Sequence, residues 1–210
     1  MAGPSEPDTD PLAPVLRALA RPGRDSSDHD LNPGFAPAPA RTLRAAGVLV
    51  PLDARPGGIA VLLTKRSSHL KHHPGQIAFP GGKVGPGDDG PVAAALRESY
   101  EEIGLHPSNV AILGTLPRHE TVTGFDVTPV VGRVLGPFEP VPEAGEVDEV
   151  FAVPLAHLAD PGNFRIETRR WKGQDRRYYV VPYGPHYIWG ATARILRTLA
   201  DRIAGAGRAG

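Results

Sequence analysis

Three glutamates lie within one short segment of the chain. Glu98, Glu101 and Glu102 are spaced i, i+3 and i+4, so in a helix their carboxylates would emerge on one face within a single turn. Like charges at this spacing repel one another, and no lysine lies within the turn, although Arg97 can reach Glu101. A divalent cation would relieve the repulsion, and oxygen ligands without histidine or cysteine favour Mg²⁺ or Mn²⁺ over zinc. The spacing therefore predicts a metal site on a helix.

The loop ahead of this helix would complete such a site. Gly81 and Gly82 let the backbone approach a ligand closely and can present carbonyl oxygens to it. Asp88 and Asp89 add acidity just before the helix begins. A glycine-rich loop beside a metal-bearing glutamate face suits a phosphate anhydride, because the cation neutralises the phosphate oxygens and polarises an attacking water.

The segment from Phe79 to Leu105 resembles the Nudix box of the Nudix hydrolases, Gly-x5-Glu-x7-Arg-Glu-U-x-Glu-Glu-x-Gly-U, in which U is bulky and apolar. The matches to the second half of the box are Arg97, Glu98, Glu101, Glu102, Gly104 and Leu105. Fourteen residues rather than thirteen separate Gly82 from Arg97, Asp88 replaces the first glutamate, and Ser99 takes a U position. The longer loop and its aspartate are typical of the Nudix coenzyme A pyrophosphatases.

A second stretch, LLTKRSSHLKHHPGQIAFPGG (62–82), resembles the signature that precedes the box in those coenzyme A pyrophosphatases. The shared frame is LLT-x-R-S, then a leucine, a histidine, Gly-Gln and Ala-Phe-Pro-Gly-Gly. Gly85 stands where that subfamily usually has an acidic residue. Looser agreement continues through 124–132 and 146–158, so the resemblance covers roughly residues 42–200.

This resemblance implies a Nudix-type fold and Mg²⁺- or Mn²⁺-dependent hydrolysis of coenzyme A or its derivatives, giving 3′,5′-ADP and (acyl-)4′-phosphopantetheine. It implies a metal held by Glu98, Glu101, Glu102 and a backbone carbonyl near Gly82. The implied catalytic residues are Glu98 or Glu101 as the base, with Arg97 orienting the glutamates. Glu146, from a later loop, could instead serve as the base or as a further metal ligand.

The candidate substrate-binding residues are Lys65, Arg66, Gln76 and Gly81. Lys65 and Arg66 belong to a locally basic strip that also contains His69, Lys71, His72 and His73. This strip could hold the phosphates of a CoA-like nucleotide, and Arg66 is the preferred contact. It could equally be a solvated loop, because basic clusters are common on protein surfaces.

Other interpretations of these segments stay open. The substrate could be ADP-ribose, NADH, a diadenosine polyphosphate or an oxidised nucleoside triphosphate. The chain could also be a non-catalytic nucleotide-binding Nudix module, although such modules usually lose box glutamates and all three remain here. Glu149 could share the role of Glu146, with Glu120 and Asp126 as weaker candidates. One aromatic residue could stack on adenine, although strand packing is the simpler role for Trp171, Tyr178, Tyr179, Tyr183, Tyr187 and Trp189.

The elements that must position these residues are strands arranged around a central helix. That helix is predicted over residues 91–105, with Pro91 in its first turn and Gly104 as its C-terminal cap. Strands are predicted over 44–52, 58–66, 109–117, 126–135 and 147–155, a hairpin over 164–171 and 176–183, and a last helix over 189–203. This order predicts an α/β fold of the α+β type, with a mixed sheet sandwiched between helices.

Composition limits the class of protein. A chain of 210 residues and 22.2 kDa suits one domain. Its 23 basic residues balance 23 acidic ones, which argues against a sequence-independent nucleic-acid binder. There is no apolar run long enough to span a membrane, and the first residues lack the features of a signal peptide. With Cys 0, disulfides, thiolate zinc sites and cysteine nucleophiles are excluded. We expect a cytoplasmic protein with a small nucleotide substrate and neither nucleic-acid nor membrane partners.

The ends of the chain differ from its centre. Prolines are concentrated in residues 1–40, which we expect to form a flexible tail carrying one short helix near 12–20. Residues 41–205 are expected to form the Nudix hydrolase domain, and residues 206–210 a frayed C-terminus. The oligomeric state is left open by the sequence.

Overall fold

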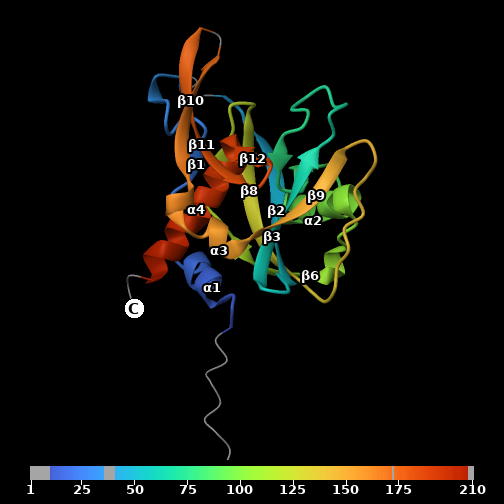
Figure 1. Cartoon of the computed structure of the whole chain (residues 1–210). Coiled ribbons are helices and arrows are strands. Elements are labelled where there is room, and N and C mark those ends of the chain that lie inside the picture. Colours follow the sequence, from blue (N-terminus) through green and yellow to red (C-terminus); the bar gives the residue numbers. More distant parts are fainter. Residues whose placement is uncertain (1–9, 36–40, 172, 208–210) are drawn as a thin grey trace, which may run out of the picture.

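The computed structural model describes residues 10–35, 41–171 and 173–207. Its centre is a nine-stranded mixed sheet (Figure 1) formed by β1 (Ser26–Ser27), β2 (Arg44–Arg55), β3 (Gly58–Arg66), β4 (Ile77–Ala78), β5 (Gly81–Lys83), β6 (Val110–Thr115), β7 (His119–Glu120), β8 (Phe125–Val134) and β9 (Val147–Pro154). The strand order is β1-β7-β8-β2-β3-β4, while β5 pairs with β2, β6 with β8 and β9 with β3. Strand β2 is central because it pairs in parallel with β8 and antiparallel with both β3 and β5.

Helices cover both faces of this sheet, as the sequence predicted (Figure 1). One face carries α2 (Gly90–Ile103), followed by a single turn, η2 (Pro107–Asn109). The other carries α4 (Gly190–Gly207), together with α3 (Leu155–Leu158) and the turn η3 (Pro161–Asn163). The helix predicted over 189–203 starts at Gly190 and continues to Gly207, so residues 206–207 are helical rather than frayed. No described helix is long and apolar enough to cross a bilayer.

A second sheet joins β10 (Arg165–Trp171), β11 (Gln174–Tyr183) and β12 (His186–Trp189). The predicted hairpin is confirmed, since Arg165 pairs with Val180 at one end and Trp171 with Gln174 at the other. Strand β12 was not predicted. It is only four residues long and ends where α4 begins, so its residues were partly assigned to that helix.

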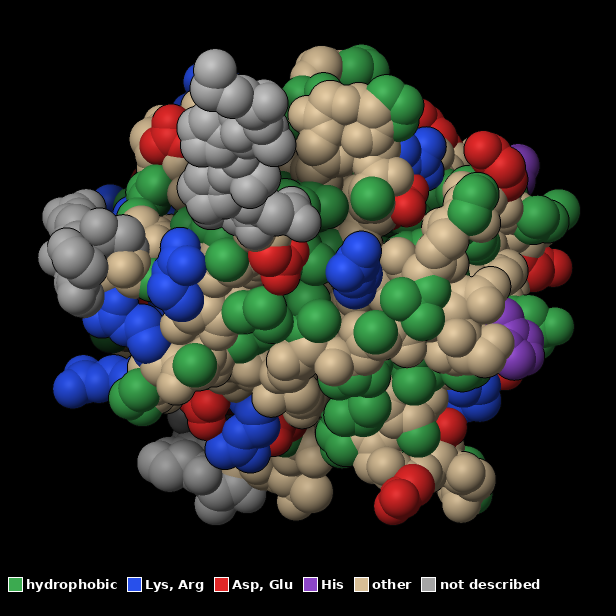
Figure 2. Space-filling view, turned by 90° about the horizontal axis from the view of Figure 1, so that it is seen from below, with side chains coloured by type: hydrophobic (Ala, Val, Ile, Leu, Met, Phe, Trp, Pro, Cys, Tyr) green, Lys and Arg blue, Asp and Glu red, His purple; other side chains and the backbone are tan. Residues whose placement is uncertain are grey.

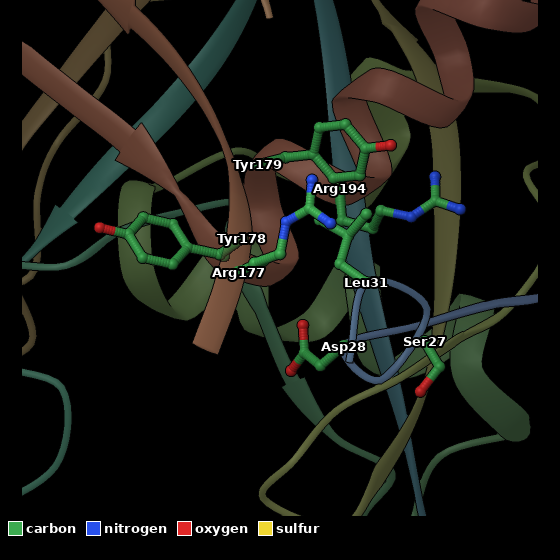
Figure 3. A pocket seen from close by; sticks show the side chains of 8 residues that line it. Ser27, Asp28, Leu31, Arg177, Tyr178, Tyr179 and Arg194 are labelled. Carbon is green, nitrogen blue, oxygen red and sulfur yellow. The ribbon is translucent and has the colours of Figure 1, made fainter. Parts of the chain in front are cut away.

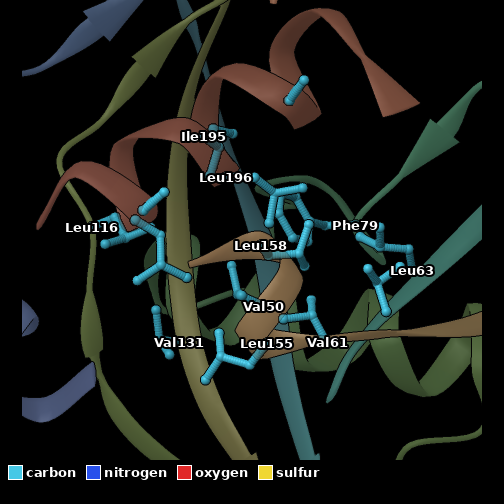
Figure 4. Close-up of a cluster of buried hydrophobic side chains, with 14 of the residues drawn as sticks. Val50, Val61, Leu63, Phe79, Leu116, Val131, Leu155, Leu158, Ile195 and Leu196 are labelled. Carbon is cyan, nitrogen blue, oxygen red and sulfur yellow. The ribbon is translucent and has the colours of Figure 1, made fainter. Parts of the chain in front are cut away.

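Two apolar clusters hold the layers together because successive β2 side chains point to opposite faces. Val50 belongs to the larger cluster, which lies between the sheet and α4 and includes Leu63, Phe79 and Leu196 (Figure 4). Leu49 belongs to the smaller cluster beneath α2, with Ala95, Ile103, Leu105 and Val130. The central helix is therefore fixed by its apolar face; of its three glutamates, Glu101 is exposed and Glu102 is buried.

The N-terminal segment differs from the expected flexible tail over its described part, residues 10–35. Helix α1 (Ala13–Leu19) packs on α4, and Leu12, Val15 and Ala18 are buried. The predicted short helix is thus present, but its apolar face has a partner, so the segment is part of the core. Residues 1–9 and 36–40 of the predicted tail, and residues 208–210, lie outside the described residues.

The rest of this segment is bound by polar contacts. Strand β1 pairs in parallel with β7, and the fully buried His119 lies 2.9 Å from the Ser26 hydroxyl and 3.2 Å from an Asp28 carboxylate oxygen. Beyond it, just before the turn η1 (Pro33–Phe35), the Asn32 side-chain amide donates to the carbonyl of Arg177 and accepts from its N–H, both at 2.8 Å. Figure 3 shows Ser27, Asp28 and Leu31 facing Arg177 and Tyr178 of β11 across a small hollow.

Candidate active site

The central helix and the glycine loop meet through strand β2. Gly81 pairs with Val48 and Gly82 with Gly47, so β5 is held beside the middle of β2. Helix α2 crosses β2 at Gly47, where an added Cβ would lie 1.8 Å from the carbonyl oxygen of Pro91. The helix ends at Gly104, whose φ of 73° gives the left-handed cap that was predicted. Glycines therefore allow the helix to lie directly against the loop.

Two of the three glutamates converge on this loop. An added Cβ at Gly82 would lie 2.4 Å from the carboxyl carbon of Glu98, so the carboxylate occupies the space that a side chain would fill. One Glu102 carboxylate oxygen accepts a hydrogen bond from the Gly81 N–H at 3.0 Å. The structure thus brings Glu98, Glu102, Gly81 and Gly82 together, as the sequence analysis expected.

The surroundings of Glu102 favour its protonated form. Burial, with only 4% of the residue exposed, is the main cause that raises its pKa to about 7, and the negative charges of Glu98 and Glu146 raise it further. The hydrogen bond from Gly81 and the positive charge of Arg66 act in the opposite direction. Glu146 and Arg66 therefore act electrostatically on the same carboxylate, although they lie far from it in the sequence.

Arg97 joins the acidic side chains of the loop and the helix. Its Nε and Nη2 donate to the two carboxylate oxygens of Asp88, both at 2.9 Å, which is the paired geometry that suits a guanidinium. It also donates to Glu98 at 3.0 Å and to Glu101 at 2.8 Å. The hydrogen bonds from Arg97, and then one from the Gly85 N–H, lower the pKa of Asp88 to about 2. The arginine therefore ties the loop ahead of α2 to the helix surface.

Glu101 has a different position from its two neighbours. Its side chain is 55% exposed and its carboxylate is bound to Arg97 rather than directed at Gly81 and Gly82. The sequence predicted all three glutamates on one face, and the structure separates Glu101 from the pair formed by Glu98 and Glu102. Glu101 lies on the side of the helix where Arg97 binds it at i+4, whereas the next residue, Glu102, is turned toward Gly81.

The donor set at the glycine loop fits a hard divalent cation. Glu98 and Glu102 supply carboxylate oxygens, and the repulsion that raises the pKa of Glu102 is what a cation would relieve. Within residues 10–35, 41–171 and 173–207, no three carboxylate or imidazole groups are arranged to hold an ion by themselves. Backbone oxygens and water would have to complete the coordination, as is usual for Mg²⁺.

A hollow of about 480 Å³ lies next to this acidic group. It is lined by Lys83, Val84, Gly85, Pro86, Gly87, Asp88, Arg97 and Glu98. Most of these residues belong to the loop between β5 and α2, which is one residue longer than the Nudix box requires. The longer loop therefore forms a wall of the space beside the catalytic candidates.

The basic strip covers the end of β3 and the loop that leads to β4. Backbone hydrogen bonds join the two ends of this loop. The Arg66 N–H donates to the Gln76 carbonyl at 3.0 Å, and the Gly75 N–H donates to the Arg66 carbonyl at 3.1 Å. Lys65 pairs with Ile77 on one side and with Glu149 on the other. The more distal basic residues, Lys71, His69, His72 and His73, are exposed. The structure thus brings Arg66 and Gln76 together at the base of this loop, and Gln76 lies five positions before the start of β5.

The later acidic candidates are placed in different ways. Glu146 acts on Glu102, whereas Glu149 lies 3.5 Å from the imidazole of His186. Glu120 is bound to Arg41 at 2.7 Å, and Asp126 is bound to Arg118 at 2.9 Å. The aromatic candidates belong to the second sheet, where Tyr187 donates to Glu167; the Trp171 side chain lies outside the described residues. Of these candidates, Glu146 is the one whose charge reaches the glutamate pair.

Two contributors were not identified as site residues from the sequence. Asp88 was noted for its acidity ahead of the helix and as a replacement in the box, but its role as the two-oxygen partner of Arg97 was not predicted. The signal available in the sequence was an acidic residue at this position of the loop, within reach of Arg97. Gly47 was assigned to a strand without a role, although the close approach of α2 depends on it. A glycine inside a strand is a weak sign of such an approach, and only the structure identifies the neighbour.

Known proteins resemble this chain over the region that carries the site. Residues 41–172 match the NUDIX domain family. The uncharacterized Nudix hydrolase NudL of Enterobacter sp. (strain 638) is 43% identical over 162 residues, covering 76% of this chain and 83% of that protein. NudL of Escherichia coli (strain K12) is 42% identical over 160 residues, with the same coverage of 76% and 83%. The crystal structure of a MutT protein from Methanosarcina mazei Go1 shares the fold, with a TM-score of 0.50 at 19% identity over 81% of this chain and 99% of that one.

Proposed function

Because this chain belongs to the Nudix hydrolase family, we propose that it is a metal-dependent hydrolase of the pyrophosphate in coenzyme A or its derivatives. The products would be 3′,5′-ADP and 4′-phosphopantetheine or its acyl form. The general activity, a Nudix pyrophosphohydrolase, follows from the family. The choice of coenzyme A is the finer step, and it rests on the sequence between residues 62 and 82.

One observation carries this choice of substrate. The segment that resembles the coenzyme A pyrophosphatase signature runs without interruption into Gly81 and Gly82, against which Glu98 and Glu102 lie. The charge of its Arg66 lowers the pKa of Glu102, which supports the proposal that Arg66 binds a phosphate near the glutamate pair. A basic group at this position suits a substrate that carries a 3′-phosphate in addition to its pyrophosphate.

Glu98 and Glu102 would hold Mg²⁺ or Mn²⁺, with backbone oxygens of the Gly81–Gly82 loop. When bound, such a cation neutralises phosphate oxygens and lowers the pKa of a coordinated water. Arg97 restrains Glu98 and Glu101 from the side of the loop. Glu101, Glu98 or Glu146 would accept the proton from the attacking water. Arg66, with Lys65 and Gln76 nearby, would hold the substrate phosphates, and the Gly81 backbone would let the pyrophosphate approach closely.

Product analysis tests this proposal. The protein would be incubated with coenzyme A, ADP-ribose, NADH or an oxidised dGTP at equal concentration, with Mg²⁺ or Mn²⁺ and with EDTA as the metal-free control. We expect 3′,5′-ADP from coenzyme A to form faster than any product of the other substrates, and only with metal. Intact coenzyme A beside a cleaved alternative would overturn the substrate choice but not the chemistry. No cleavage of any substrate would favour a nucleotide-binding module.

A further inference from the structure

A second hollow lies between the loop that follows α1 and the C-terminal half of α4, with a volume of about 290 Å³. It is lined by Arg21, Pro22, Gly23, Arg24, Pro117, Arg194, Thr198, Asp201, Arg202 and Gly205. Seen from below, on the side where α1 lies, lysine and arginine side chains gather at the left edge of the molecule (Figure 2). None of the residues that line this hollow belongs to the candidate active site.

Among the described residues that line this hollow, arginines outnumber carboxylates. Arg194 is bound to Asp30 at 2.8 Å, and the carboxylate of Asp201 is bound to Arg197 at 2.9 Å. In the part of the chain that the structure describes, no carboxylate lies within ion-pair distance of the other three arginines that line the hollow, namely Arg21, Arg24 and Arg202. Three guanidinium groups without a carboxylate partner among the described residues therefore give this hollow a positive charge, in a chain with a net charge of +0.

Arg202 lines the hollow and is held in place by backbone carbonyl groups. Its Nη2 donates to the carbonyl oxygens of Ala18 at 2.6 Å and Arg21 at 2.5 Å, which fixes the guanidinium at the end of α1. Its Nε is buried and has no hydrogen-bond partner among the described residues. Burial, and then the positive charge of Arg21, lower the pKa of Arg202. An anion bound between the Arg202 guanidinium and the positive charge of Arg21 would reduce the repulsion between them.

Two glycines lie against the arginines of this hollow. An added Cβ at Gly23 would lie 2.1 Å from Nη1 of Arg202, and one at Gly205 would lie 3.5 Å from Nη1 of Arg21. Any larger residue at Gly23 would displace the Arg202 side chain. The volume is slightly below the range of pockets that enclose drug-sized ligands, so a small anion fits better than a whole cofactor.

We propose that this hollow, the arginine pocket, is a binding site for a phosphate group, carried either by free pyrophosphate or by a small phosphoester. Arg21 and Arg24 would donate from the N-terminal segment and Arg202 from α4. The ligand would therefore join the N-terminal segment to α4, and it would stabilise their contact. This proposal is independent of the substrate that the candidate active site cleaves.

The test uses the full chain in EDTA, titrated calorimetrically with pyrophosphate and, in parallel, with AMP at constant ionic strength. Variants are Arg21→Ala/Arg24→Ala in the pocket, Arg66→Ala at the candidate active site, and Arg133→Ala as an exposed arginine control on β8. Arg21 and Arg24 are exposed and bind no carboxylate in the described structure, so their replacement is expected to leave the fold intact. Thermal unfolding with and without ligand provides the second readout.

We expect the double variant to weaken binding of at least one of the two probes roughly tenfold or more, because each charge-assisted contact contributes about that much. The same variant should lose the ligand-induced rise in Tm, while Arg133→Ala behaves as the parent. Which probe is affected identifies the source of the phosphate. Binding that is unchanged in the double variant, or that is lost in Arg66→Ala alone, would overturn the arginine pocket.

Discussion

Glu98 and Glu102 of helix α2 lie against the same glycine loop but in different electrostatic surroundings. Glu98 is held by the positive charge of Arg97, whereas Glu102 is buried, accepts a hydrogen bond from Gly81 and has its pKa raised to about 7. A cation bound between them would compete with the proton that burial favours on Glu102. The two residues therefore contribute differently to metal binding even though they are one helical turn apart.

Glu102→Gln tests the metal site. The amide has nearly the same shape, so the fold should persist, but it is neutral and binds a cation poorly. We expect Mg²⁺-dependent activity to fall roughly 10²-fold or more. Circular dichroism checks the fold and calorimetric Mg²⁺ titration checks the metal. Glu139→Gln, an exposed matched change, should have no effect; a Glu102→Gln protein as active as the parent would contradict the assignment.

Arg97→Lys tests whether the guanidinium geometry is needed rather than its charge. Lysine cannot donate to both oxygens of Asp88 while also reaching Glu98 and Glu101. We expect the glutamates to lose their alignment and kcat to fall roughly 10²-fold, with a smaller change in KM. The steady-state parameters of Arg133→Lys provide the control. Equal kcat values in the two variants would show that Arg97 has no orienting role.

The contact between α2 and the sheet depends on glycines in strands β2 and β5. At Gly47 the neighbour is the backbone of the helix, and at Gly82 it is the carboxylate of Glu98. A backbone atom cannot move without displacing α2, whereas a carboxylate can rotate away. The same substitution should therefore damage stability at one position and catalysis at the other.

Gly47→Ala and Gly82→Ala make this contrast measurable. Gly47→Ala would place a methyl group 1.8 Å from the Pro91 carbonyl oxygen, so we expect the free energy of unfolding to fall by about 3 kcal/mol or more. Gly82→Ala should lower the free energy of unfolding less and abolish most activity, because Glu98 must leave its position. Urea denaturation and hydrolysis rates are the readouts. Gly34→Ala, which meets no atom within 4 Å, is the control. A similar loss of stability in all three would refute the contrast.

Across the whole molecule, the N-terminal segment completes the layer that contains α4. Leu12 and Val15 belong to the same apolar cluster as Leu196 and Leu199, and His119 of the neighbouring strand β7 binds Ser26 of β1. This segment is therefore expected to fold and unfold together with the domain. Its removal would expose the α4 surface that α1 covers.

Two leucines of this segment provide a matched pair. Leu12 is 2% exposed and Leu16 is 39% exposed. We expect Leu12→Ala to lower the free energy of unfolding by about 2–5 kcal/mol, because it leaves a cavity in the main core. Leu16→Ala should change it by only about 0.5 kcal/mol. Both values come from urea denaturation at equilibrium. If the two variants unfold at the same urea concentration, residues 10–35 are a solvated appendage as the sequence first suggested.

Local sequence patterns were sufficient to predict the helices and strands whose conformation depends on residues close to them in the chain. Pro91, the alanines that follow it and Gly104 define α2 through local conformational preferences, and the alternation of 164–183 defines the hairpin. The glutamate spacing then places the candidate site on α2. The short strands β1, β4, β7 and β12 have little pattern of their own, since each exists only because another strand lies beside it.

The roles of individual groups depended on contacts between distant segments. Glu101 and Glu102 are adjacent in the chain, but a helix turns about 100° per residue, so one is bound to exposed Arg97 and the other is buried against Gly81. The proline-rich start of the chain resembled a solvated tail because its few apolar residues are useful only when α4 covers them. Spacing along the chain thus determined which residues could act together, and packing between β2, β5 and the two long helices decided which of them meet.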